Sequence, residues 1–366
     1  MRIGLVSADF APNVGGVASH VVELGRALAA LGHEIHVITL PLGGQRQARS
    51  TWQGMQIHRP GIPKAKPLYS WLVRRFLKRL IRQENIEIIH VHGLRPLEAS
   101  QGLSVPVIFT NHTSGYLMRI EKGPREQAKM RKRMAHVHHV LAPSEELAEA
   151  TRRVGYENPV DFISNGVDVR RFAPGVSSLR EAHGISPDEV VVLLARRLVE
   201  KNGVTVYAEA VSALKGHPVR LLFAGDGPDR SEVERLLVSG GVADLAIFLG
   251  NIDNSQMPDI YRAADLSVLP SRREATSITG LESMATGLPL VGTRVGGIPF
   301  LIEDQETGLL VPPDDPPALG AALRKLVEDA PLRKRLGAAA RVRAEARFDW
   351  SRIAEATAKV YGRYLS

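Results

Sequence analysis

The segment EATSITGLE places two glutamates, Glu274 and Glu282, on either side of three hydroxyl-bearing residues. Ionised carboxylates accept hydrogen bonds, so both side chains are candidate ligand-binding groups. The apolar run LSVL just before this segment predicts a buried strand, and a helix is expected to begin near Thr276 or Ser277, which are good N-cap residues. Spacing alone favours a plainer interpretation, in which Glu274 interacts with the helix dipole and Glu282 is an exposed helix residue.

A second group of candidate residues is cationic. The segment ARRLVEKNG follows a strand-like run and contains Arg196, Arg197 and Lys201. Guanidinium and ammonium groups at the end of a strand suit a diphosphate. A solvated basic loop explains the same residues equally well.

Glycine-rich turns follow two of the predicted strands. Near the N-terminus, PNVGGVASH places Gly15 and Gly16 at the start of a helix, where free amides can bind an anion or a sugar hydroxyl. The segment AGDGP, which contains Gly225, forms another such turn. The first turn is not G-x-G-x-x-G, and no acidic residue follows at the expected distance, so a dinucleotide site is disfavoured.

The candidate residues follow predicted strands, so they can form a site only if those strands end at the same edge of a sheet. Strand-like runs alternate with helical patterns twice, first over residues 2–144 and again over residues 189–293. This alternation predicts an α/β fold with two parallel sheets, each covered by helices on both faces. Ligands of such sheets bind beyond the carboxyl ends of the strands, where the candidate residues fall. Residues 165–175, NGVDVRRFAPG, suit a linker between the two rounds.

Composition bounds the class of protein. The chain has 366 residues, more than one typical core holds, and it has no cysteine, which excludes disulfides and thiolate metal sites. The first apolar run is too short for a signal sequence, and no apolar stretch approaches the length of a membrane span. We therefore predict a soluble, cytoplasmic protein with two domains.

The formal net charge of +8 is concentrated in the N-terminal half, where no acidic residue occurs between Glu34 and Glu84. Within this region WLVRRFLKRLIR predicts a helix with one apolar and one cationic face, and KMRKRM at residues 129–134 adds a second basic segment. A solvated helix face and attraction to an anionic membrane or acceptor explain the helix equally well. Nucleic acid is disfavoured because no aromatic platform accompanies the charge. The residues expected to contact acceptor or membrane are His20, Arg74, Arg75, Lys78 and Arg79.

Taken in order, the motifs resemble those of the retaining glycosyltransferases of family 4. The similarity includes PNVGGVASH, NGVDVRRFAP, RRLVEKNG, AGDGP, ADLSVLPS and the E-x7-E segment followed by MATGLPLVGTRVGGIP, and it covers most of the chain. The resemblance implies the GT-B fold, with two facing Rossmann-like domains and a deep cleft between them. We expect an acceptor-binding domain at 1–168, a nucleotide-sugar-binding domain at 169–345, and a C-terminal helix, 346–366, that packs back on the first domain.

The resemblance assigns the two glutamates to the donor and replaces the plainer interpretation. Glu274 matches a residue that binds hydroxyls of the donor sugar, and Glu282 matches one that binds the ribose. Arg197 and Lys201 match cations that neutralise the diphosphate leaving group without a metal. His112 matches an active-site histidine beside the donor sugar, so the predicted catalytic residues are His112, Arg197, Lys201 and Glu274. The other predicted donor contacts are Gly16, Arg196, Gly225, Ser277 and Ile278.

The chain departs from the family pattern at three places. EATS replaces the common EGFG, so Ala275 and Ser277 stand where glycines are usual, and we expect the amide contacts to persist while Thr276 alters sugar selection. RRLVEKNG is shorter than the common segment, which leaves open whether Lys201 or Asn202 occupies the lysine position. Phe300 stands where GGIPE commonly has a glutamate.

The remaining histidines have structural explanations. His90 and His92 alternate with apolar residues in IIHVHG, and HVHH at 136–139 has the density of a metal cluster. The absence of a glutamate around them, and the metal independence that the resemblance implies, favour structural roles. His20, near the start of the first helix, is expected to line the cleft.

The predicted function is transfer of a hexose-type unit from a nucleoside diphosphate sugar to an acceptor hydroxyl, with retention at the anomeric carbon and with no metal or other cofactor. The expected partners are the nucleotide sugar, a sugar or lipid-linked acceptor, and an anionic surface at the inner face of the plasma membrane. Cell-envelope glycan or glycolipid assembly is the expected process. Two alternatives remain open, a nucleotide-sugar epimerase of the same fold and a donor-binding protein without transfer activity.

Overall fold

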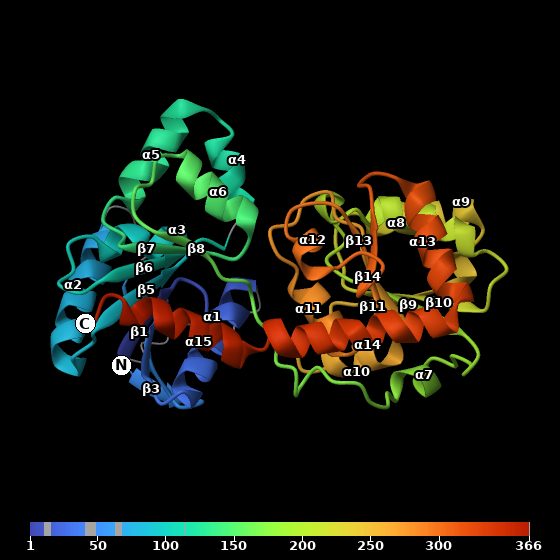
Figure 1. Ribbon diagram of the computed structural model, residues 1–366, viewed down its shortest axis with the longest axis horizontal. Coiled ribbons are helices and arrows are strands. Elements are labelled where there is room, and N and C mark those ends of the chain that lie inside the picture. Colours follow the sequence, from blue (N-terminus) through green and yellow to red (C-terminus); the bar gives the residue numbers. More distant parts are fainter. Residues whose placement is uncertain (11–15, 41–48, 63–67, 113, 366) are drawn as a thin grey trace. The chain divides into compact units, whose positions relative to one another are not determined.

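The computed structural model describes residues 1–10, 16–40, 49–62, 68–112 and 114–365, which form two compact units (Figure 1). The N-terminal unit comprises Met1–Gly166 together with the segment that begins at Trp350, and the C-terminal unit comprises Val167–Asp349. The chain therefore passes between the units twice. The sequence-based domain boundaries lie after residues 168 and 345, whereas the structure divides the two units after Gly166 and after Asp349.

An eight-stranded sheet organises the N-terminal unit. Its strands are β1 (Arg2–Ser7), β2 (Glu34–Ile38), β3 (Arg49–Trp52), β4 (Met55–His58), β5 (Ile88–His92), β6 (Val107–Thr110), β7 (His139–Ala142) and β8 (Val160–Phe162). The order is β3-β4-β2-β1-β5-β6-β7-β8, and every pair is parallel except β3–β4. Strands β5, β6 and β7 are buried at every position, including the two histidines of β5 and the one of β7.

The helices of this unit are α1 (Gly16–Ala30), α2 (Leu68–Glu84), α3 (Leu94–Leu97), η1 (Glu98–Ser100), α4 (Ser114–Ile120), α5 (Pro124–Met134), α6 (Glu145–Arg153) and α15 (Trp350–Gly362). The last of them, α15, packs beside α1 although the two are far apart in sequence. It contributes Trp350, Ile353 and Tyr361 to the core that also contains Leu24 and Leu28 of α1. The N-terminal unit is therefore completed by the end of the chain.

A six-stranded parallel sheet organises the C-terminal unit. Its strands are β9 (Val190–Ala195), β10 (Val219–Ala224), β11 (Ala246–Gly250), β12 (Leu266–Leu269), β13 (Leu290–Thr293) and β14 (Gly308–Val311). The order is β11-β10-β9-β12-β13-β14. Because β9 and β12 are neighbours, the loops that follow them meet at the carboxyl edge of the sheet.

Helices cover both faces of the second sheet. They are α7 (Leu179–Ala182), η2 (Glu200–Asn202), α8 (Val204–Ala210), η3 (Val211–Leu214), α9 (Arg230–Gly240), η4 (Ala243–Leu245), α10 (Met257–Ala263), α11 (Ile278–Ala285), α12 (Ile298–Leu301), α13 (Pro316–Glu328) and α14 (Ala330–Arg347). Alternate residues of β9 enter two different cores, Val192 and Leu194 in one and Val191 and Leu193 in the other. This explains the unbroken apolar run VVVLLA, because both faces of the strand are buried. The predicted two-sheet α/β architecture is confirmed.

The hairpin formed by β3 and β4 was not predicted from the sequence. Its turn contains Gln53 and Gly54, with φ values of 49° and 79°, so both lie in the left-handed region. Two-residue hairpin turns favour that backbone, but Asn-Gly or Asp-Gly normally signals it, and Gln-Gly does not. Among the described residues, no helix is both long enough and apolar enough to cross a bilayer.

Candidate active site

Arg196 and Glu274 meet at the carboxyl edge of the second sheet. Arg196 follows β9 and Glu274 lies in the loop after β12, and the neighbouring position of these strands brings the loops together. The Arg196 guanidinium donates through Nη2 to Glu274 Oε2 and through Nη1 to Ser271 Oγ. The Arg196 and Glu274 side chains are only 10% and 13% exposed. One cation and one carboxylate are therefore fixed in place next to the start of α11.

Two glycines permit this close approach of loops. A Cβ atom at Gly203 would lie 1.7 Å from the carbonyl oxygen of Pro270, and one at Gly225 would lie 2.1 Å from the carbonyl oxygen of Arg196. Both also have positive φ values, 66° and 140°. Gly225, predicted as a donor contact, therefore has a structural requirement of its own: no side chain fits between it and the strand end that carries Arg196.

Helix α11 starts where the sequence predicted. Ser277 is its N-cap, and the Ser277 hydroxyl accepts from the Gly280 amide at 3.1 Å. Ile278 is the first helical residue. The first amides of a helix have no intrahelical acceptor, so the amides next to Ile278 suit an anionic or hydroxylated ligand. The serine that replaces the usual glycine is thus used as a cap.

Glu282 lies inside the protein rather than on the surface. It is 6% exposed, and its Oε2 accepts from the Tyr261 hydroxyl at 2.8 Å. Burial raises the pKa of the Glu282 carboxyl from its ordinary value of 4.5 to about 7, against the opposing effects of the Tyr261 hydrogen bond and of Arg171. The interpretation of Glu282 as an exposed helix residue is wrong. Tyr261 was missed, because nothing local marks a tyrosine 21 residues away as its partner.

The raised pKa of Glu282 predicts a pH-dependent stability. Because the folded protein holds this proton more tightly than the unfolded chain, the contribution of Glu282 to the free energy of unfolding should fall as pH rises from about 4.5 to about 7. The contribution is up to about 3 kcal/mol, and Glu282→Gln should lack it. Urea unfolding of both proteins at about pH 5 and pH 8 measures the difference. A wild-type minus variant difference that stays constant between the two pH values contradicts this prediction.

Arg197 and Lys201 have exposed side chains, whereas Asn202 is buried. The Asn202 amide donates to the carbonyl oxygen of Arg197 at 2.7 Å, so this side chain holds the loop together. The carbonyl oxygen of Lys201 accepts from the backbone amides of Arg272 and Arg273 at 3.0 and 3.2 Å, which ties the two loops to each other. Of the two candidates for the lysine position, Lys201 is the one with an exposed side chain.

Phe300 has a packing role in place of the usual glutamate. Its ring lies 5.7 Å from that of Phe348, edge to face, and the Arg347 guanidinium lies 5.3 Å from its centroid. The ring therefore packs against the end of α14.

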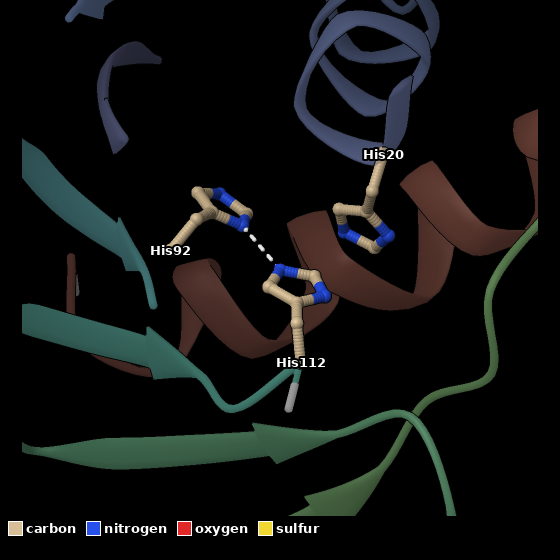
Figure 2. Close-up of side chains that lie close together, drawn as sticks. All are labelled: His20, His92 and His112. Atoms are coloured by element: carbon tan, nitrogen blue, oxygen red, sulfur yellow. Dashed lines mark hydrogen bonds between the residues drawn. The ribbon is translucent and has the colours of Figure 1, made fainter. Parts of the chain in front are cut away.

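In the N-terminal unit, three histidines lie close together (Figure 2). His92 ends β5, His112 follows the neighbouring β6, and His20 lies on α1. His92 Nδ1 and His112 Nε2 are 3.0 Å apart, and the ring centroids of His20 and His112 are 4.4 Å apart. Adjacent strand ends and the first helix thus bring His20 and His92 to the predicted active-site histidine. Gly16 is the first residue of α1 and is exposed; Gly15 lies outside the described residues.

These imidazoles are neutral at physiological pH. Burial lowers the pKa of His20 to about 4, and burial together with neighbouring histidines lowers the pKa of His92 and of His112 well below the ordinary value of 6.5. The Nδ1 atom of His20 lies 2.8 Å from Asn165 Oδ1, so it carries the proton and donates to that oxygen.

One nitrogen from each of His20, His92 and His112 lies within 4.8 Å of the others, so the cluster must be considered as a metal site. A histidine that binds a metal normally donates its other ring N–H to a fixed acceptor. His20 has such an acceptor in Asn165, but His92 Nε2 is buried with no hydrogen-bond partner. The three imidazoles therefore lack the fixed second acceptor that a metal-binding His92 would need, and their arrangement suits a hydrogen bond between His92 and His112 instead.

The other histidines singled out from the sequence have separate partners. His90 lies 2.6 Å from both the Tyr361 hydroxyl and the Thr110 hydroxyl. His136 Nε2 lies 2.9 Å from Ser100 Oγ, and His139 Nδ1 lies 3.0 Å from the Tyr364 hydroxyl. His138 Nδ1 accepts from the Val107 amide. Among the described residues, HVHH therefore forms no converging ligand set.

The basic helix is α2, which buries Tyr69, Val73, Leu77, Leu80 and Ile81. Arg75, Lys78 and Arg79 are exposed, and Trp71, beneath the Arg75 guanidinium, is 54% exposed. Arg74 differs, because it is half-buried and donates to the carbonyl oxygen of Glu98 at 2.8 Å. Arg74 therefore belongs to the packing of the unit, and the exposed cationic face starts at Arg75.

Comparison with known proteins identifies the class to which this fold and site belong. The model of the glycosyl transferases group 1 matches residues 176–343, and that of glycosyltransferase family 4 matches residues 14–171. The chain belongs to these glycosyltransferases. It is 28% identical to a D-inositol 3-phosphate glycosyltransferase of Xylanimonas cellulosilytica over 98% of this chain and 96% of the other. It is 26% identical to the alpha-monoglucosyldiacylglycerol synthase of Acholeplasma laidlawii over 84% of each chain.

Solved structures define the fold. Sucrose-phosphate synthase from Thermosynechococcus elongatus matches with a TM-score of 0.83 at 25% identity, over 99% of this chain and 98% of the other. Anabaena HepE, solved in complex with UDP-glucose, matches with a TM-score of 0.81 at 19% identity, over 99% of this chain and all of the other. The fold is GT-B, as the resemblance implied.

Proposed function

We propose that the protein is a retaining, metal-independent glycosyltransferase that moves a sugar from a nucleoside diphosphate sugar to an acceptor hydroxyl. The observation that carries this proposal is the convergence of Arg196, Glu274 and the capped start of α11 at one sheet edge. A carboxylate held by a guanidinium beside free helix amides suits a ligand with both hydroxyl and phosphate groups. Glu282, deeper in the same helix, is assigned to the ribose.

The proposed chemistry requires positioning and charge stabilisation more than a protein nucleophile. The bond between the anomeric carbon and the β-phosphate oxygen breaks while the acceptor oxygen bonds to the same face of that carbon. The acceptor proton passes to the departing phosphate oxygen, so atoms and charge balance. Arg197 and Lys201 stabilise the negative charge that develops on the diphosphate, and His112 contacts the donor sugar.

A donor screen tests this function. Nucleoside diphosphate sugars are compared by thermal shift, since a ligand bound to the folded state raises its melting temperature. The best donor is then incubated with candidate acceptors, and the anomeric configuration of the product is read by NMR. Inversion at the anomeric carbon contradicts retention. Donor conversion without an acceptor indicates an epimerase, and donor binding without any turnover indicates a binding protein.

We further propose that the acceptor is presented at an anionic membrane surface in envelope glycan or glycolipid assembly. The support is the exposed part of α2, which carries the cations Arg75, Lys78, Arg79 and Arg82 and, near its start, the exposed side chains of Leu68 and Trp71. Each cation near an anionic leaflet contributes about 1 kcal/mol, and salt screens this attraction. Lipid synthesis by the diacylglycerol-modifying relative agrees with such an acceptor.

The α2 face should bind vesicles reversibly. We expect co-sedimentation with vesicles containing anionic lipid at low ionic strength and release at high salt, because screening weakens each contact. A variant with glutamine at Arg75, Lys78, Arg79 and Arg82 should lose binding while it stays folded and binds donor. The matched control removes four cations from exposed positions of α13 and α14, at Arg324, Lys325, Lys334 and Arg335. Equal losses in both variants would mean that net charge, and not the α2 face, is responsible.

A further inference from the structure

The contact between His92 and His112 constrains which nitrogen of each imidazole ring carries the proton. His92 Nδ1 and His112 Nε2 are 3.0 Å apart (Figure 2), and the two ring planes are nearly parallel, with an interplanar angle of 20° and centroids 5.3 Å apart. A neutral imidazole has one N–H donor and one acceptor nitrogen. A single proton therefore lies between the two rings, and either His92 or His112 is its donor.

The surroundings of the other His92 nitrogen distinguish the two cases. His92 Nε2 is buried and has no hydrogen-bond partner. If His112 donates, His92 must carry its own proton on Nε2, as an N–H buried without an acceptor. If His92 donates from Nδ1, its Nε2 is a bare acceptor instead. Buried N–H groups without partners are rarer in proteins than buried acceptors without partners, so the second case is favoured.

We propose that His92 is a positioning residue that donates from Nδ1 to His112 Nε2 and thereby fixes His112 as the Nδ1–H tautomer. His112 is half-buried, and its Nδ1–H is left as a neutral donor for an oxygen atom of the substrate. This N–H group would bind a hydroxyl or phosphate oxygen and would not bind a cation. That His112 contacts substrate rests on the proposed function, whereas the tautomer does not.

The His92 ring is itself held by fixed neighbours. His90, two residues earlier on β5, faces it with ring centroids 4.1 Å apart. The His90 ring lies 2.6 Å from the hydroxyls of Tyr361 on α15 and Thr110 on β6. His20 approaches His112 from α1 and is oriented by Asn165. The Nδ1–H group of His92 is therefore held in its orientation by packing, and the His92 side chain does not have to become ordered when substrate binds.

NMR of the wild-type protein tests the tautomer directly. Two-bond proton–nitrogen spectra of the ¹⁵N-labelled protein distinguish a protonated from an unprotonated ring nitrogen, and a His112→Gln spectrum assigns the signal. We expect a protonated Nδ1 and an unprotonated Nε2 in His112. A protonated Nε2 in His112 overturns the proposal. This measurement requires no catalytic activity, so it decides the inference even if sugar transfer is never observed.

Variants at His92 test the positioning role. The side-chain amide introduced by His92→Asn can place an N–H close to the position of Nδ1, whereas His92→Leu has no donor. We expect His92→Leu to lower kcat by about tenfold, the effect of one hydrogen bond, and to change the donor KM little. His92→Asn should recover most of that loss. Nucleoside diphosphate affinity and melting temperature identify folded variants, and equally low kcat in two folded variants overturns the positioning role.

Discussion

Replacing Arg197 or Lys201 by alanine is expected to lower the turnover number by about a hundredfold or more, the effect of losing one fixed charge or donor at a developing anion. Both side chains are exposed at the carboxyl edge of the second sheet, next to the fixed pair of Arg196 and Glu274. Arg196 is occupied by that carboxylate, so its charge is partly neutralised. Arg197 and Lys201 retain their charge for the departing diphosphate.

The control for this prediction is Arg235→Ala, which removes one exposed cation from α9 in the same unit. It should leave turnover within about twofold of wild type, since surface charges contribute little. A chelator should have little effect on any of these proteins. Activity that disappears with EDTA and returns with a divalent cation would contradict the metal-free mechanism and require the histidine cluster to be reconsidered as a metal site.

Glu282→Ala is expected to weaken binding of the free nucleoside diphosphate by about 1–3 kcal/mol, the range for losing hydrogen bonds to a charged group. The carboxylate is buried against Tyr261, so its position is fixed before ligand arrives. Isothermal calorimetry measures this affinity. Unchanged affinity in a folded variant would remove Glu282 from the ribose site.

Glu274 provides the contrasting case. Glu274→Gln should reduce turnover of the sugar donor while sparing nucleoside diphosphate affinity, because its assigned contacts are with the sugar. Glutamine is preferred to alanine here, since its amide oxygen can still accept from the Arg196 guanidinium. If donor and nucleoside diphosphate lose the same affinity, the sugar has been assigned to the wrong carboxylate.

Strand composition and local capping made most of the fold predictable. Residues 190–195 and 266–269 are apolar at nearly every position because both faces of these strands are buried, and Ser277 signals a helix start through its own side chain. The bond between Tyr261 and Glu282 was not predictable, because it depends on how α10 packs against α11. The contact between His92 and His112 depends on β5 and β6 being neighbours, and the alternation of strands and helices does not specify strand order.

The return of α15 to the N-terminal unit has a consequence for biosynthesis. Chains are made from the N-terminus, and domains generally fold as units as they emerge. The C-terminal unit is contiguous in sequence, and its core requires no residue beyond Asp349. The N-terminal unit, although synthesised first, must wait for Trp350, Ile353 and Tyr361. A premature stop near residue 349 would therefore damage the N-terminal unit, which is far from the stop in sequence, because the chain would lack α15 and with it the Tyr361 hydroxyl that contacts His90.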